Sequence, residues 1–150
     1  MELDPKIPKV YFMHRRPLEE DKSKALRGGV TAFFAFYYNE KTRESEVQYA
    51  VARCSFLDNF SRPRSREIAT GKFAKGKKRR FTLEPMTLKE ARWEAHSRVK
   101  AECDRQLDEE RRWYESLCQA RLEVQEAFKV LRFVQKVGRE RRQQYEEVAG

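Results

Sequence analysis

Several features that mark common classes of small protein are missing from this sequence of 150 residues. No apolar run approaches the roughly 18 residues that a membrane span needs, so we expect a soluble protein without membrane contact. The first charged residues are the acids Glu2 and Asp4, and Pro5 and Pro8 interrupt the stretch that follows, unlike the basic and apolar regions of a secretory signal. These absences favour a cytoplasmic protein.

Cysteine and histidine are also scarce. Cys54, Cys103 and Cys118 lack CxxC spacing, which argues against a disulfide framework or a zinc site and favours a reducing compartment. His14 and His96 are the only histidines, and the sequence places no catalytic partner beside either of them. We therefore predict a protein that is not an enzyme and that uses no metal or cofactor.

Positive charge is what the sequence has in excess, with 33 Lys and Arg against 24 Asp and Glu and a net charge of +9. Positions 1–85 hold 19 basic and 11 acidic residues, whereas positions 86–150 are nearly balanced at 14 and 13. Glu67 is the one acid among nine basic residues between positions 62 and 80. The nine are Arg62, Arg64, Arg66, Lys72, Lys75, Lys77, Lys78, Arg79 and Arg80.

Such a cluster of cations predicts a polyanionic partner. Ammonium and guanidinium groups follow the phosphates of DNA or RNA, and the release of counterions then contributes to the affinity. An acidic protein surface is the alternative partner for the same residues.

The first half of the chain has the pattern of an antiparallel sheet. Residues 9–14, 30–38 and 46–54 are rich in β-branched and aromatic side chains, and the polar residues 39–42 between the last two predict a hairpin. A polar stretch over residues 18–27 leads to Gly28-Gly29, which we expect in a turn. Phe34, Phe36 and Tyr38 share one strand face, which is typical of a buried core or of a platform that stacks on RNA bases. Apolar residues on both faces of this strand favour the core.

A short basic helix and an edge strand are predicted next. Ser61 followed by Arg62-Pro63 is a helix start, and Ile68, Ala69 and Phe73 form a narrow apolar stripe. Residues 79–84 then return as an edge strand that Pro85 ends.

From Thr87 onward the sequence predicts one or two long helices. Thr87 and Glu90 fit a capping box, and neither glycine nor proline follows before Gly138. One stripe consists of Leu88, Ala95, Val99, Cys103 and Leu107. A later stripe with heptad spacing consists of Trp113, Leu117, Ala120, Val124, Ala127, Leu131 and Val134. The heptad fails upstream of Trp113, so a bend near residues 108–112 would give a helical hairpin, and an unbroken helix is the alternative.

The later stripe is a candidate interface. The large residues of the stripe, with the neighbouring Phe128 added, are the ones that we expect at the interface: Trp113, Leu117, Val124, Phe128, Leu131 and Val134. The stripe is expected to pair with the upstream helix, to cover the sheet, or to meet its copy in a homodimer.

One stretch resembles a known group of proteins. In residues 54–69, a strand ends in Cys54, Asp58-Asn59-Phe60-Ser61-Arg62 follows, and a helix containing Arg66-Glu67-Ile68-Ala69 comes next. This order resembles small accessory proteins of phages and other mobile elements, although Ser65 stands where that pattern has glycine. The resemblance implies a regulator or inhibitor, with Asp58 capping the turn and Phe60 anchoring it.

Together these patterns predict an α+β fold. Residues 1–85 form a small antiparallel β-rich module with the basic segment, and residues 86–150 form a helical region that packs on the sheet or mediates dimerisation. The expected function is a non-enzymatic accessory protein that binds nucleic acid through backbone contacts. The alternative is a protein-interaction module, such as an inhibitor encoded by a mobile element that binds an acidic host protein or complex.

Overall fold

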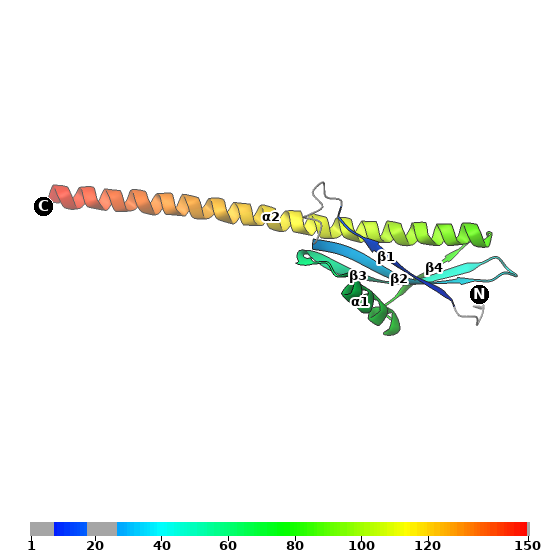
Figure 1. Cartoon of the computed structure of the whole chain (residues 1–150). Helices are drawn as coiled ribbons and strands as arrows, with labels where there is room; N and C mark the ends of the chain where they lie inside the picture. The colour runs from blue at the N-terminus through cyan, green and yellow to red at the C-terminus, as the bar shows by residue number, and fades with distance from the viewer. Residues whose placement is uncertain (1–7, 18–26, 150) are drawn as a thin grey trace. The chain divides into compact units, whose positions relative to one another are not determined.

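The computed structural model describes residues 8–17 and 27–149, which form a four-stranded antiparallel sheet and two helices (Figure 1). In chain order the elements are β1 (Lys9–Arg15), β2 (Arg27–Tyr38), β3 (Ser45–Asn59), α1 (Arg62–Ala74), β4 (Arg79–Leu83) and α2 (Leu88–Ala149). The predicted α+β fold is thereby confirmed. The predicted polar stretch before Gly28 lies, apart from Arg27, outside the described residues.

The strands lie in the order β1-β2-β3-β4, so β2 and β3 are central and β4 is the predicted edge strand. β2 and β3 form the predicted hairpin, in which the Asn39 N–H donates to the Glu44 carbonyl over 2.9 Å. Phe34 and Phe36 are buried, at 0% and 4% exposed. This strand is therefore core and does not offer a stacking platform for RNA.

Gly28 and Gly29 lie inside β2, so the turn predicted there is wrong. The register between β2 and β3 shifts at this point, as it does at a β-bulge. Gly28 has a φ of +74°, and a Cβ built on it would lie 2.5 Å from the Phe56 ring. A Cβ on Gly29 would lie 2.6 Å from the Phe60 ring. Glycine is required here because two aromatic rings close directly over the backbone.

One face of the sheet packs against the first part of α2. The buried helix residues repeat every four positions, and each is at most 6% exposed: Ala91, Ala95, Val99, Cys103 and Leu107. The His96 ring adds edge-on contacts with Tyr11 and Phe34, at centroid distances of 4.7 and 5.0 Å. Leu88 was predicted in this stripe, but it is 41% exposed. Four positions before Ala91 the stripe reaches Thr87, which caps the helix. Leu88 therefore lies beside the stripe and not in it.

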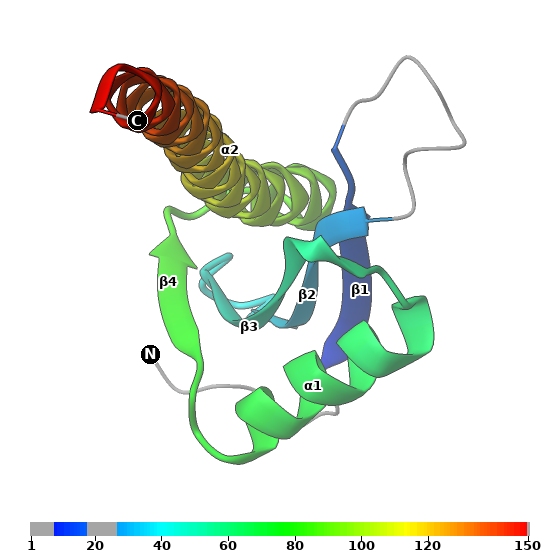
Figure 2. The same ribbon diagram turned by 90° about the vertical axis from the view of Figure 1, so that its left-hand side faces the viewer.

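α1 covers the opposite face of the sheet (Figure 2). Ser65 and Ala69 are buried, and the Phe73 ring meets Phe33 edge-on at 4.9 Å. The stripe of α1 therefore steps from 65 to 69 to 73. Ile68, which was predicted in the stripe, is 42% exposed because a helix turns by about 100° between neighbouring residues.

α2 is a single helix, so the helical-hairpin alternative is wrong. At its start the Thr87 hydroxyl accepts from the Glu90 N–H over 3.3 Å, as the capping box predicts. The chain divides into two compact units, one through Arg111 and one from Arg112 onward. This boundary falls later than the predicted one at 85/86, because the first turns of α2 belong to the core of the sheet. Neither described helix has the length and apolar content that crossing a membrane requires.

Candidate nucleic-acid interface

The nine basic residues lie on α1, on the turn after it and on β4. α1 begins at Ser61, whose side-chain oxygen accepts from the Arg64 N–H over 3.4 Å, and Pro63 occupies the first turn. That turn contains no acidic residue. The positive end of the helix dipole therefore adds to the charges of Arg62 and Arg64 and favours an anion near this end.

Arg66 is held against β1. Its Nε donates to His14 Nε2 over 3.2 Å, its guanidinium lies 5.2 Å from the centroid of the Phe12 ring, and His14 Nδ1 is 2.7 Å from the Thr31 hydroxyl oxygen. The pKa of His14 is lowered, first by burial and then by the charges of Arg66 and Arg62. A neutral imidazole that accepts from Arg66 and donates to Thr31 satisfies all of these contacts.

Lys72, Lys78 and Arg80 also have partners. Lys72 Nζ donates to the Val51 carbonyl over 3.1 Å, and Lys78 Nζ lies 4.3 Å from the centroid of the Phe73 ring. An Arg80 nitrogen is 3.9 Å from Glu46. These three cations contribute to packing of α1 and β4 as well as to surface charge.

Arg79 faces away from its neighbour Arg80. The alternation of β4 turns Arg79 toward α2, where it lies 3.9 Å from a Glu102 oxygen. Glu102 also bonds Arg105, and its pKa is lowered to about 2, first because Arg105 hydrogen-bonds its ionised form. Arg79 is thus separated from the α1 side, although the sequence places it in the same cluster.

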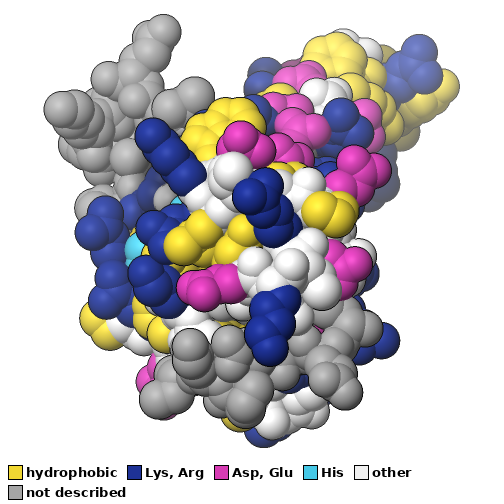
Figure 3. Space-filling view, turned by 90° about the vertical axis from the view of Figure 1, so that its right-hand side faces the viewer, with side chains coloured by type: hydrophobic (Ala, Val, Ile, Leu, Met, Phe, Trp, Pro, Cys, Tyr) yellow, Lys and Arg dark blue, Asp and Glu magenta, His cyan; other side chains and the backbone are white. Residues whose placement is uncertain are grey.

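Arg62, Arg64, Lys75 and Lys77 are exposed and make no ion pair with any residue that the structure describes. They come from the start of α1 and from the turn that follows it. Figure 3 shows one face of the chain, on which lysine and arginine side chains gather along one side while acidic side chains intersperse the rest. These four charges are available to an external anion without loss of an internal ion pair.

A shallow hollow of about 810 Å³ lies beside α1 and is lined by four cations, Arg64, Lys72, Lys75 and Lys77. Ile68 and Gly71 form part of its floor, and a Cβ built on Gly71 would meet nothing within 4 Å. A ligand can therefore approach the helix closely here. Glu67 is the acid that lines this hollow.

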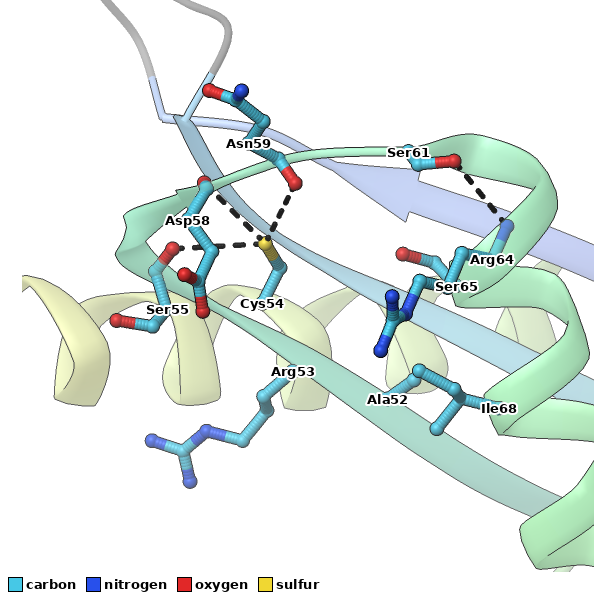
Figure 4. A pocket seen from close by; sticks show the side chains of 10 residues that line it. All are labelled: Ala52, Arg53, Cys54, Ser55, Asp58, Asn59, Ser61, Arg64, Ser65 and Ile68. Atoms are coloured by element: carbon cyan, nitrogen blue, oxygen red, sulfur yellow. Dashed lines mark hydrogen bonds between the residues drawn. The ribbon is translucent and has the colours of Figure 1, made fainter.

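A second hollow, of about 470 Å³, lies where β3 ends and α1 begins (Figure 4). Cys54 lines this hollow, and its Sγ lies 3.6 to 3.7 Å from the carbonyl oxygens of Ser55, Asp58 and Asn59. Burial is the largest of the effects that raise the pKa of Cys54. The thiol thus stays protonated and donates to a carbonyl, which makes it a poor nucleophile. Arg64 lines both hollows.

The Phe60 ring packs against neighbouring side chains in this region, whereas among the described residues the side chain of Asp58 forms no cap. The Phe60 ring stacks under the Arg16 guanidinium at 4.3 Å and contacts His14 edge-on at 5.9 Å. Within the described residues the Asp58 carboxylate makes no hydrogen bond. Arg16, whose Nε donates to the Gly28 carbonyl over 2.9 Å, is a contributor that the sequence pattern did not single out.

The described residues hold no group of three or more His, Cys, Asp or Glu that could bind a metal ion. The two histidines lie on opposite faces of the sheet: His14 of β1 contacts Arg66 of α1, whereas His96, which belongs to α2, contacts Phe34 on the other face. His96 Nδ1 is 2.8 Å from the Arg92 carbonyl, so its ring is fixed within the helix.

The predicted helical interface lies in the second unit and is largely exposed. Trp113, Val124, Phe128, Leu131 and Val134 are 49 to 58% exposed, and Leu117 is half-buried. Within this unit the stripe therefore covers no sheet and pairs with no other described helix.

Comparisons of the chain with models of known protein families, with curated proteins and with solved structures found no match.

Proposed function

We propose that α1 and the turn that follows it bind the phosphate backbone of a nucleic acid, as part of a non-enzymatic accessory role. The observation that supports this function is the set of four exposed cations without ion-pair partners, Arg62, Arg64, Lys75 and Lys77. Binding to phosphate releases condensed counterions, and here it breaks no salt bridge among the residues that the structure describes. The start of α1 adds the positive end of a helix dipole.

We expect contacts with the phosphate backbone to contribute more to binding than contacts with the bases. Residues 62–80 contain neither asparagine nor glutamine, which are the usual readers of adenine. The Thr70 hydroxyl donates to the Arg66 carbonyl of its own helix over 2.7 Å, which leaves it less available for a base. Affinity that depends strongly on salt and weakly on sequence is the expected behaviour.

The experiment measures binding of the full chain to labelled duplex DNA, single-stranded DNA and RNA over a series of salt concentrations. In the test variant Arg64, Lys75 and Lys77 are changed together to Ser. Loss of three phosphate contacts lowers the slope of log affinity against log salt by about 2 to 3. The matched control changes Lys89, Lys100 and Lys136 to Ser, which removes the same charge from exposed positions of α2. An equal slope in both variants and the wild type contradicts the proposal.

An acidic protein partner is the competing explanation for the same face. Poly-L-glutamate of matched charge serves as its probe in the same titration. If the test variant loses affinity for poly-L-glutamate alone and keeps its affinity for all three nucleic acids, the face binds acidic protein and the nucleic-acid function is wrong.

A further inference from the structure

From Arg112 onward, α2 presents large apolar side chains that nothing in the described chain covers. Trp113 is 49% exposed, Phe128 57% and Leu131 50%. Val124 and Val134 of the same stripe are 53% and 58% exposed, so half-exposed apolar side chains follow one another over about three heptads. A monomeric soluble protein rarely leaves an apolar patch of this size in water.

The spacing of the stripe suits another helix. Its residues step alternately by four and three from Trp113 to Val134, and one further step of four leads to Gly138. A heptad of this kind keeps one seam facing a partner helix over its whole length.

No contact among the described residues explains Gly138. It lies inside α2, where glycine is about 1 kcal/mol less favourable than alanine. Its φ is not positive, and a Cβ built on it would meet nothing within 4 Å. A close approach by a second molecule would account for a position without a side chain.

The sizes of the stripe residues are complementary about a point between Gln125 and Glu126. Reversing the order of the stripe about this point pairs large residues with small ones, except in one layer of Leu and Val. The layers are Trp113 with Gly138, Leu117 with Val134, Ala120 with Leu131, and Val124 with Ala127. We propose that two copies of this chain associate as an antiparallel pair of α2 helices, in which Trp113 of each copy packs over Gly138 of the other.

A parallel pair fits these residues poorly. Each residue of the stripe would then face itself, so Trp113 would be crowded while Ala120 and Ala127 would leave voids. The next position of the same register is Arg141, which would face its own copy as a like charge. In the antiparallel pair, Arg141 lies beyond the last apolar layer.

The flanking positions also favour the antiparallel pair. Arg121 meets Phe128 of the other copy, where a cation can lie over an aromatic ring. Glu123 meets Val130, so no like charges face each other along these layers.

The first experiment determines the mass of the full chain by light scattering and its association by sedimentation. We expect a species of twice 18.0 kDa at micromolar concentration. A chain that stays monomeric at 100 μM, a concentration on the order of that which a weak interface needs, overturns the proposal.

Substitutions at Gly138 separate the two orientations. Gly138→Leu raises helix propensity, yet it places bulk under Trp113 and is expected to weaken the dimer at least tenfold. Gly138→Ala is the matched control, with a similar gain in propensity and little bulk. The double variant Trp113→Ala with Gly138→Leu restores a large and a small residue to the layer and recovers the dimer. Circular dichroism confirms that each variant keeps its helix. If Gly138→Leu tightens the dimer, Gly138 faces its own copy or solvent, and the antiparallel arrangement is wrong.

A distance measurement tests the orientation directly. A spin label is attached to Ser116→Cys in a background with Cys54→Ser and Cys118→Ser, while the buried Cys103 remains unlabelled. In the antiparallel pair the two labels are separated by about 30 Å along the helix axes, from a rise of 1.5 Å per residue. In a parallel pair they lie within about 15 Å, close to the distance between packed helices. The shorter distance overturns the proposal.

Discussion

α2 contains two apolar stripes that differ in the size and in the cover of their residues. The first, from Ala91 to Leu107, begins with two alanines and lies fully buried against the sheet. The second, from Trp113 onward, includes tryptophan, leucine and valine side chains that are about half exposed. Hydrophobicity alone does not distinguish the two stripes, but residue size does.

The size of the residues in each stripe follows from the surface against which the stripe packs. Small residues let the helix backbone approach a sheet whose aromatic residues, such as Tyr11 and Phe34, fill the space between them. Large residues spaced by heptads fill the seam between two helices instead. The second stripe therefore needs a helical partner, which the antiparallel pair provides.

The strongest test of this contrast is the loss of a large core side chain. Phe34→Ala is expected to lower the free energy of unfolding by about 3 to 5 kcal/mol, because the side chain is fully buried and leaves a cavity. Phe133→Ala is the control, since Phe133 is 67% exposed and lies outside the heptad seam. Urea unfolding at equal protein concentration compares the two. Similar losses in both variants would show that the contrast is absent.

A smaller effect is expected from added bulk. Ala95→Leu inserts three carbons where the helix meets the sheet and should destabilise the fold by about 1 to 3 kcal/mol. Ala101→Leu makes the same change at an exposed position of the same helix and should alter the stability by less than about 0.5 kcal/mol. Thermal unfolding of both variants measures the difference. Equal melting temperatures would contradict close packing at Ala95.

The smallest effect concerns pH. Burial is the main cause that raises the pKa of Cys103 to about 12, from an ordinary value near 9. The unfolded chain therefore loses this proton at lower pH than the folded chain, so the contribution of Cys103 to stability is lost as pH rises from about 9 toward 12.

Urea unfolding at pH 7.5 and pH 10 measures this contribution. Between these values the wild type should lose about 1 kcal/mol more than Cys103→Ala. Cys118→Ala, in the second unit, should behave like the wild type. The interpretation is contradicted if Cys103→Ala shows the same pH dependence as the wild type.

Local patterns predicted most of the secondary structure. The hairpin of β2 and β3, the cap at Ser61 and the start of α2 at Thr87 all follow from side chains within a few residues of one another. The Gly28-Gly29 pair was wrongly predicted as a turn because its cause is distant. Phe56 and Phe60, about thirty residues away, close over it.

The candidate site was predicted as a run of charge, and its arrangement came from the fold. Alternation along a strand separates Arg79 from Arg80, but only the position of α2 gives Arg79 a partner in Glu102. The contact between Arg66 and His14 joins residues 52 positions apart, for which the sequence contains no signal. The mirror order of Trp113 and Gly138 is readable in the sequence, yet its meaning depends on exposure.

Composition and local periodicity were sufficient to predict the α+β class, the place of the positive charge and the spacing of both helical stripes. The fold was needed to show which cations pair, which stay exposed, and which apolar stripe is covered. Those outcomes depend on which faces meet across long separations in the chain, and packing of the sheet against α1 and α2 sets them.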